Sequence, residues 1–557
     1  MQPLISAILP EVILVAVACV LFLIGITSSA HVRKAAPVLA VIALMSVFAL
    51  QLFRITGESV PADPWNTFRV DALAQYVKLL VSGVGVLLVL VAWPISRTAT
   101  RSPGMDLGQE TGEFFGLMLL SITGVFLVAG ANDLILFFLG IELASIPTYI
   151  MVSISRPLPQ AQEAGVKYFF LGAMSAALLL FGFSYLFGST GLIHLDQIGS
   201  VFQNSVQTSG GLTGLQMLGV LMVLCGLAFK MAAVPLHFYA ADVYQGAATQ
   251  VTAFLSFIPK TTGLIAIVKL LQMVGGPDYA IPAIVVKLLL VVAILTMTAG
   301  NVLGLLQHNV KRVLAYSSVA HSGYLLAAVA ALAGAHNLLP ASEAALVHQS
   351  ALVGLLFYIG AYGVMSVASF GILTLLPSRG DEIATSAETF DDLTGTGRSH
   401  LILGLCMAIA CFGLTGVPLT TGFIGKIYIL RPALELSQLS TGMFVLVIAI
   451  VVNAAISAAY YLKIVNAMFV RTDHHLAAHL HGGHPAHHYA GTHGHDRPGH
   501  EGLEAAPIRF AVVLACAITL MMGIPIFPFA NAVTDRVREA LVHPATKTPP
   551  FASASTK

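Results

Sequence analysis

Long apolar segments dominate this chain and constrain its fold more than any other feature. Of its 557 residues, 57% are hydrophobic and only 10% are charged, and the mean hydropathy is +0.87. A soluble domain of this size cannot bury so much apolar surface, whereas a bilayer covers it readily. We therefore predict an all-α polytopic membrane protein, because open backbone cannot face lipid.

About 14 segments are long enough to cross a bilayer as helices. Their boundaries, read from the apolar runs, are roughly 4–27, 36–53, 71–95, 112–130, 133–152, 163–187, 213–235, 248–272, 280–304, 313–333, 345–376, 401–430, 441–469 and 507–530.

Basic residues collect in alternate loops, which predicts the orientation of the chain. Arg33, Arg156 and Lys311 lie in or beside odd-numbered loops, whereas the stretch 188–217, in an even-numbered loop, has no Lys or Arg. Since loops rich in Lys and Arg stay on the cytoplasmic side, we expect the odd loops there and both termini on the periplasmic side.

Two predicted spans are interrupted in similar ways. The seventh reads GLAFKMAAVPLHFYAADVY around Pro235, and the twelfth reads CFGLTGVPLTTGFIGKIYIL around Pro418. Each proline removes a backbone donor and predicts a break, and each break has one lysine beside it, Lys230 or Lys426. The breaks lie five spans apart, and this odd offset is typical of an inverted repeat with its transport site at the broken helices.

Four ionisable residues, Glu142, Lys230, Lys260 and Lys426, lie inside these apolar spans. A charge there costs about 2.5–3.5 kcal/mol on insertion scales, so such residues usually have a function. A buried carboxylate takes up a proton unless a cation is close, and a buried amine loses one unless a carboxylate is close. We interpret the four as a proton relay through the middle of the membrane; a structural ion pair between helices is the alternative.

Further polar residues lie near this series. Lys167 either tunes the carboxylate–lysine pair of spans five and seven or extends to the cytoplasmic surface. His237 and Asp242 follow the first break and His321 lies in the tenth span, where each histidine is either a relay or a satisfied hydrogen-bonding group. Lys311 is fully explained as a topology anchor.

Two polar segments outside the spans receive a simpler interpretation. Glu388, Asp391 and Asp392 are expected to contact water or neighbouring subunits. The segment 471–506 holds ten of the 19 histidines and is interpreted as a solvated cytoplasmic loop. A zinc or nickel site is the alternative there, but the irregular spacing lacks a carboxylate or cysteine frame, so we predict no metal site.

Several functional classes lack their signatures in this sequence. No Gly-rich nucleotide loop, CxxC frame or pair of intramembrane histidines is present, so we predict no cofactor bound by this chain. A net charge of +1 without a basic face predicts no nucleic-acid partner.

Five ordered motifs identify a family. The segments IELASIPTYIMV, KYFFLGAMSAA, GLAFKMAAVPLHFYAADVYQGAATQVTAFLSFIPK, GNVLGLLQHNVKRVLAYSSVAHSGYLL and GLTGVPLTTGFIGKIYIL resemble the antiporter-like subunits of respiratory complex I, the proton-pumping NADH:quinone oxidoreductase. The N-type subunit is the most similar. The resemblance implies two inverted five-helix repeats, helices 4–8 and 9–13, with helices 7 and 12 broken.

The resemblance also implies a function and its residues. Proton translocation coupled to quinone reduction elsewhere in the complex would use Glu142, Lys167, Lys230, Lys260 and Lys426. NADH, FMN, iron–sulfur clusters and quinone would lie in partner subunits, M-type and K-type subunits would be neighbours, and the location would be a bacterial inner membrane. The implied regions are 1–111 (helices 1–3), 112–272 (first repeat), 273–470 (second repeat), 471–506 (His-rich loop) and 507–557 (last helix and tail).

Related proteins and other functions stay open at the level of sequence. M-type subunits usually carry a glutamate where this chain has Lys426, L-type subunits are longer, and multisubunit sodium/proton antiporters share part of the pattern. The corresponding membrane protein of the ferredoxin-dependent photosynthetic complex is also similar. An independent cation/proton antiporter or a scaffold with merely paired charges are the alternative functions.

Overall fold

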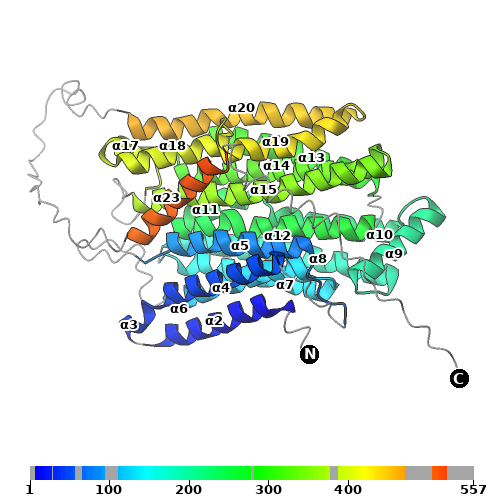
Figure 1. Cartoon of the computed structure of the whole chain (residues 1–557), viewed down its shortest axis with the longest axis horizontal. Coiled ribbons are helices and arrows are strands. Elements are labelled where there is room, and N and C mark those ends of the chain that lie inside the picture. Colours follow the sequence, from blue (N-terminus) through cyan, green and yellow to red (C-terminus); the bar gives the residue numbers. More distant parts are fainter. Residues whose placement is uncertain are drawn as a thin grey trace, which may run out of the picture.

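The computed structural model describes residues 7–27, 29–56, 65–94, 111–156, 158–276, 281–376, 387–470 and 505–523. Over these residues the chain is helical, and its only extended pairings are three isolated bridges between loops. Figure 1 shows the long helices lying side by side in one bundle. The all-α prediction is confirmed, whereas nearly all of the His-rich segment and the C-terminal tail fall outside the described residues.

The predicted spans correspond to helices of the structure. Among the described residues, eleven helices are long and apolar enough to cross a membrane, and three shorter apolar helices accompany them. The helices are α2 (Leu9–Ile26), α3 (Ala30–Arg33), α4 (Ala36–Thr56), α5 (Ala72–Val91), α6 (Thr111–Gly130), α7 (Leu134–Ile154), α8 (Pro159–Thr190), α9 (Leu195–Ser209), α10 (Gly214–Lys230), α11 (Tyr239–Gly246), α12 (Thr249–Gly275), α13 (Ala283–Leu305), α14 (Val310–Leu338), α15 (Ala341–Leu375), α16 (Phe390–Leu393), α17 (Thr396–Ser399), α18 (Leu401–Thr415), α19 (Thr421–Ser437), α20 (Thr441–Phe469) and α23 (Ala506–Met521).

Both predicted breaks are present. The seventh span divides into α10 and α11, and the twelfth into α18 and α19. The predicted end of the seventh span at residue 235 is wrong, because the chain resumes as α11 after the break. Each break holds a residue other than glycine in the left-handed region, Ala232 at φ +52° and Leu419 at φ +73°. Such conformations are costly and are maintained only where the surrounding packing enforces them.

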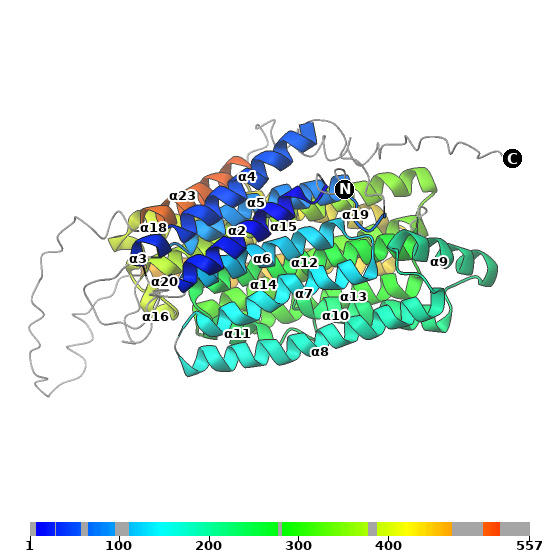
Figure 2. The ribbon, with the colours of Figure 1, turned by 90° about the horizontal axis from the view of Figure 1, so that it is seen from below.

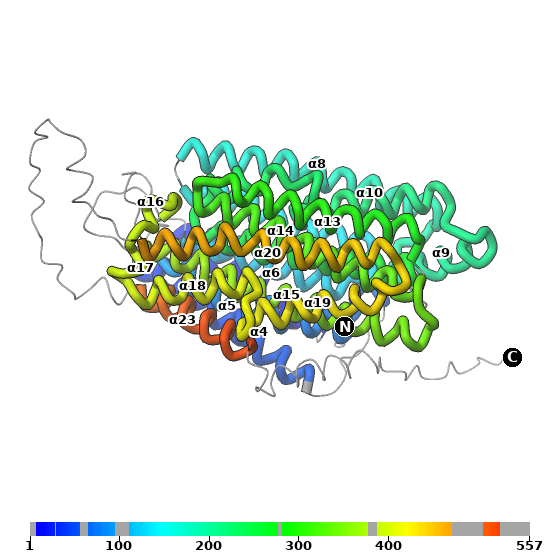
Figure 3. Tube along the Cα trace, turned by 90° about the horizontal axis from the view of Figure 1, so that it is seen from above, coloured from blue at the N-terminus to red at the C-terminus, as the bar shows by residue number. Residues whose placement is uncertain are grey.

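Helices α12 and α14 form the centre of the bundle. The most apolar 18-residue window of each is completely buried by protein. A helix that is apolar on all sides needs neighbours on all sides, and α12 has no preferred polar face. Helices α2 and α20 lie at opposite edges (Figure 1), and the views from below and above agree on this arrangement (Figures 2 and 3).

Two helix pairs approach each other in the same way. A Cβ atom on Gly124 of α6 would lie 2.2 Å from the backbone nitrogen of Ala144 on α7. A Cβ atom on Gly300 of α13 would lie 2.5 Å from the backbone nitrogen of Ala320 on α14. Small residues permit this close packing of membrane helices. The two pairs occupy the first two positions of the predicted repeats and thereby support the internal duplication.

One helix of the structure was not anticipated. Helix α9 occupies the loop that lacks Lys and Arg, and its buried residues Leu195, Ile198 and Phe202 recur along one side. In Figure 1, α9 lies at one end of the bundle, and α3 and α17, which are next to basic residues, lie at the other. The basic residues of α3 and α17 are thus separated in space from the loop that lacks Lys and Arg.

The interpretation of Lys311 and of the acidic loop needs correction. Lys311 is completely buried and donates to the carbonyl oxygens of Gln245 and Ala247, at 3.1 and 2.7 Å. Its ammonium also lies 3.3 Å from Glu388, which pairs with Arg156 at 2.6 Å. Asp392 is buried too, in a capping box at the start of α16. The ion pairs of Glu388 with Lys311 and Arg156 therefore hold the residues just before α16 against the bundle.

Substituting Gly124 tests the α6–α7 contact. We expect Gly124→Ala to lower the free energy of unfolding by about 1–3 kcal/mol, since the added methyl group overlaps the backbone of α7. Gly188→Ala in α8 is the matched control, because its Cβ meets no atom within 4 Å. Thermal unfolding of the detergent-solubilised chain measures both variants, and equal melting temperatures would contradict the packing described.

Substituting Glu388 tests the buried ionic network. Burial raises the pKa of this carboxyl, but Lys311 and Arg156 outweigh burial and hold its pKa below the ordinary value. Its stabilising contribution is therefore complete at neutral pH and is lost as the pH falls through the folded-state pKa. We expect Glu388→Gln to cost about 3–5 kcal/mol at pH 7, because two buried cations lose their partner.

Thermal stability measured between neutral and acidic pH checks this expectation. The variant should lose stability at neutral pH and show a weaker decline on acidification than the original chain. Asp391→Asn, in the same segment but at an exposed position, should behave like the original chain. An equal effect of both substitutions would exclude a special role of the buried network.

Candidate functional site

The first element of the site is a carboxylate–lysine pair between α7 and α10. Lys230 is the last residue of α10, and its Nζ lies 3.2 Å from Glu142 Oε1. It also donates to Ser145 Oγ at 2.9 Å and to Tyr149 OH at 3.1 Å. Only 3% of the Lys230 side chain is exposed. One carboxylate and two hydroxyl groups thus replace the hydration shell of the ammonium.

A small cavity separates Lys230 from Lys260. The aromatic residues Tyr168, Tyr239 and Tyr244 line it together with the two lysines. It has room for about one water molecule. The two amines therefore face one small space, which tyrosine rings and apolar side chains such as Val243 and Leu255 also line.

Lys260 is bound by residues of α14. Its Nζ donates to the carbonyl oxygen of Ser318 and, at 2.9 Å, to Ser322 Oγ. Ser322 in turn donates to the carbonyl oxygen of Met231 at 2.6 Å, directly after Lys230 in the broken helix. The fully buried helices α12 and α14 therefore connect the second lysine to the first break.

His321 continues the row on α14. Its two ring nitrogens lie 2.7 Å from Tyr358 OH and 3.1 Å from Tyr461 OH, so both are satisfied by hydroxyl groups. Its ring centroid is 5.8 Å from that of Tyr324, and Lys426 Nζ lies 4.8 Å from the Tyr324 ring. His321 thus lies between Lys260, in the middle of the bundle, and Lys426, at the second break.

Lys426 is held at the second break without a carboxylate. Its Nζ donates to the carbonyl oxygens of Thr415 at 2.7 Å and Leu414 at 3.2 Å, in the last turn of α18. The C-terminal end of a helix carries a partial negative charge, which favours a cation there. Gly416 ends α18 at φ +86°, and its lack of a side chain makes room for the lysine stem.

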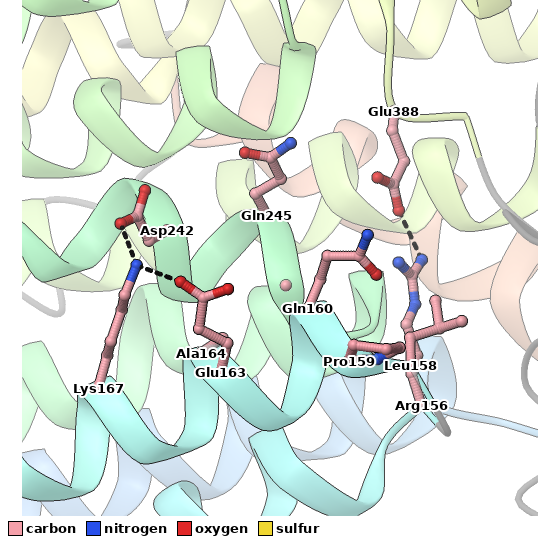
Figure 4. A pocket seen from close by; sticks show the side chains of 11 residues that line it. Arg156, Leu158, Pro159, Gln160, Glu163, Ala164, Lys167, Asp242, Gln245 and Glu388 are labelled. Carbon is pink, nitrogen blue, oxygen red and sulfur yellow. Dashed lines mark hydrogen bonds and ion pairs between the residues drawn. The ribbon is translucent and has the colours of Figure 1, made fainter.

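A pocket of about 490 Å³ opens at the end of the bundle that carries α3 and α16. Figure 4 shows Lys167 between Glu163 and Asp242 on one side of this pocket, with Arg156 reaching toward Glu388 on the other. Lys167 Nζ lies 2.7 Å from Glu163 and 3.1 Å from Asp242. Charged groups of both signs therefore line a concave surface at the basic-loop end.

The structure divides the predicted site residues into a row, a pair in the outer pocket and one separate histidine. Glu142, Lys230, Lys260, His321 and Lys426 form one row across the bundle. Two others, Lys167 and Asp242, lie in the outer pocket and make no direct contact with that row. The last, His237, is half-buried within the first break.

The serine and tyrosine residues that bind Lys230 and Lys260 were not predicted from the sequence. Ser145 and Tyr149 lie three and seven residues after Glu142, on the same face of α7. Ser318 and Ser322 are likewise one turn apart on α14. Helical spacing from Glu142 was a usable signal on α7, and His321, three residues after Ser318, was the corresponding signal on α14.

The chemistry of the row is that of groups that exchange protons. Among the residues that the structure describes, no group of three or more His, Cys, Asp or Glu side chains lies close enough to hold a metal ion. The row contains amines, hydroxyl groups and an imidazole. Each of these groups can donate a proton, and hydroxyl groups, neutral amines and neutral imidazole can also accept one.

Known proteins resemble this chain over most of its length. Residues 131–457 match the family described as NADH:quinone oxidoreductase/Mrp antiporter, TM. NADH-quinone oxidoreductase subunit N of Myxococcus xanthus is 36% identical over 477 residues, which cover 83% of this chain and 88% of the relative. Subunit N of Trichlorobacter lovleyi is 31% identical over 527 residues, covering 93% and 94%.

Solved structures agree with these relatives. A chain of respiratory complex I from Thermus thermophilus with bound aureothin superposes with a TM-score of 0.66 at 26% identity, covering 92% of this chain and 98% of its own. A chain of the Mrp complex from Dietzia sp. shares the fold, with a TM-score of 0.70 at 18% identity, covering 96% and 97%. This multi-pass membrane protein therefore belongs to the NADH:quinone oxidoreductase/Mrp antiporter family, in its group of NADH-quinone oxidoreductase N subunits.

Proposed function

We propose that this chain, as the N-type subunit of a complex I membrane arm, translocates protons along the row from Glu142 through Lys230 and Lys260 to Lys426. The observation that carries the proposal is the position of the lysines. Each is buried, and two of them lie at helix breaks. Polar groups replace water around each ammonium, from α7 for Lys230 and from the end of α18 for Lys426. Intramembrane ionisable groups arranged in this way mark transport routes.

The outer pocket supports proton uptake at the basic-loop end. Helix α11 lies between the two cavities, because Asp242 and Gln245 line the outer pocket while Tyr239 and Tyr244 line the inner one. Lys167 and Asp242 would then collect protons at the surface rather than form part of the buried row. A displacement of this one short helix would join the pocket to Lys230.

The Glu142–Lys230 pair supplies a switch for the transfer. While the carboxylate is ionised and close, it stabilises the ammonium of Lys230. When the carboxylate moves away or takes up a proton, the ammonium releases its proton through the small cavity toward Lys260. Neutral amine, hydroxyl and imidazole groups beyond it can accept the proton in turn.

Partner subunits would supply the driving energy. We infer that NADH, FMN, iron–sulfur clusters and quinone are bound elsewhere in the complex and that quinone reduction drives this subunit. M-type and K-type subunits would be its neighbours in a bacterial inner membrane, with both termini periplasmic and the loop 471–506 cytoplasmic. Proposed boundaries are 112–272 and 273–470 for the two repeats, after three helices in 1–111 and before the last helix in 507–557.

Neutralising Glu142 or Lys230 tests the proposal in the assembled complex. We expect Glu142→Gln and Lys230→Met each to lower proton pumping by about 10²-fold, the scale on which a proton-transferring group acts. Pumping is measured in inverted membrane vesicles alongside NADH-driven quinone reduction. Glu435→Gln is the control, because this carboxylate belongs to an exposed i,i+4 ion pair with Arg431.

The other functions predict different results. A scaffold predicts that the charge-swapped variant Glu142→Lys with Lys230→Glu pumps normally. An independent antiporter predicts that the purified chain alone exchanges sodium for protons in liposomes. Either result would overturn the proposal.

Lys426 offers a test that separates transport from stability. We expect Lys426→Met to lower pumping as strongly as the first pair does, with little loss of thermal stability, because the variant no longer buries a charge. Lys463→Met on the exposed face of α20 is the matched control. A variant that pumps normally, or one that loses pumping only because it no longer assembles, would count against a role of Lys426 in the route.

A further inference from the structure

A second buried ion pair lies outside the proposed proton route. Lys78 of α5 and Glu11 of α2 are 2.7 Å apart, and their side chains are 0% and 5% exposed. Helices α2 and α5 belong to the N-terminal part of the chain, before the first repeat. A buried pair of this kind costs desolvation energy that well-packed apolar residues would avoid.

Helix α4, which packs against both α2 and α5, and Glu11 itself have spare hydrogen-bonding capacity. Gln51 of α4 is completely buried, and within the described part of the chain neither atom of its amide group has a hydrogen-bond partner. Glu11 Oε2, the carboxylate oxygen outside the ion pair, likewise has no hydrogen-bond partner among the described residues. Arg54, one turn after Gln51 on α4, acts electrostatically on both members of the pair. Purely structural buried pairs normally satisfy all their polar atoms, whereas a site that changes protonation state needs spare donors and acceptors.

The pair is connected to the helix that carries Glu142. Lys78 Nζ lies 4.7 Å from the ring centroid of Phe68. The Phe68 ring fills the space beside Gly130, at the end of α6, and Arg69 N donates to the Gly130 carbonyl oxygen at 2.7 Å. Helix α7 begins four residues after Gly130. A change of charge at Lys78 therefore acts on the turn that positions α7.

A second connection leads to the helix that carries Lys260. Asp71 caps the N-terminus of α5, two helical turns before Lys78, and lies 3.2 Å from Lys269 of α12. Lys269 follows Lys260 by about 14 Å along α12. The Asp71 side chain is 42% exposed, and nearby Asn66 donates to Asp196 of α9 at 2.9 Å. Asp71 thus lies at the surface of the end opposite the basic loops.

We propose that Glu11 and Lys78 form a second proton-holding site, which exchanges protons with the membrane surface opposite the basic loops through Asp71 and Lys269. Within the site, one proton moves from Lys78 Nζ to the Glu11 carboxylate, leaving a neutral amine and a carboxylic acid. The neutral amine then takes up a proton that the Lys269 ammonium passes on through Asp71, and Lys269 regains its proton from the surface. The reverse transfers release the proton and restore the ion pair. This inference rests on the proposed function, because it supplies a further group to the same transport.

The test compares single and double substitutions in the assembled complex. We expect Glu11→Gln, and the double variant Glu11→Gln with Lys78→Met, to lower proton pumping by about 2- to 30-fold, the range over which coupled residues act at a distance. The amount of assembled complex should stay unchanged in the double variant, since no unpaired charge is left buried. Infrared difference spectra of resting and active complex should contain a carboxylic acid C=O band that Glu11→Gln removes.

The outcomes separate this inference from a structural pair and from failure of the proposed function. Full pumping in the double variant, or an infrared spectrum unchanged by Glu11→Gln, would overturn the inference. Where the single variant does not assemble, the double variant decides, because it removes both charges. Glu142→Gln and Glu435→Gln are measured in the same vesicles. Normal pumping by Glu142→Gln would refute the proposed function, whereas impaired Glu142→Gln with normal Glu11 variants would refute the inference alone.

Discussion

Burying an amine inside a membrane protein requires replacement of its hydration shell, and the architecture of this chain follows from that requirement. Three lysines of the row meet it differently. Lys230 uses a carboxylate and hydroxyl groups, Lys260 uses a serine and a backbone carbonyl, and Lys426 uses the carbonyl end of α18. The end of a helix leaves carbonyl oxygens free, so the second break is a natural place for Lys426, whereas the partners of Lys230 are side chains of α7.

The two halves of the chain use similar helix packing to hold different chemistry. Glu142 lies two residues before Ala144, at the α6–α7 contact, and Ser318 lies two residues before Ala320, at the corresponding α13–α14 contact. Glu142 binds Lys230, whereas Ser318 binds Lys260 through its carbonyl oxygen. Because the second half has Ser318 where the first half has Glu142, Lys426 has no carboxylate partner there. Its ammonium instead binds the carbonyl oxygens at the C-terminal end of α18. The two halves therefore share their helix packing, whereas different residues at matching positions give the two ends of the row different partners for their lysines.

Most of the fold was predictable from the sequence. Apolar length located the spans, and proline beside lysine located both breaks, because these signals are local. The roles of Lys311 and Glu388 were not predictable in this way. Basic residues at a loop normally face solvent, and only the return of the α15–α16 connection onto the bundle buries this lysine. Helix α9 was missed because a polar, amphipathic segment carries no membrane signal.

The sequence by itself determined the class of protein, its family and the ionisable residues placed in apolar segments, because the cost of a buried charge is a property of the residue and its immediate neighbours. Only the tertiary structure decided which of these residues form one row. In the structure, Lys167 and Asp242 lie in an outer pocket, and Glu11 and Lys78 form an ion pair between two different helices. Such pairings depend on how helices rotate and approach one another, which no local pattern specifies.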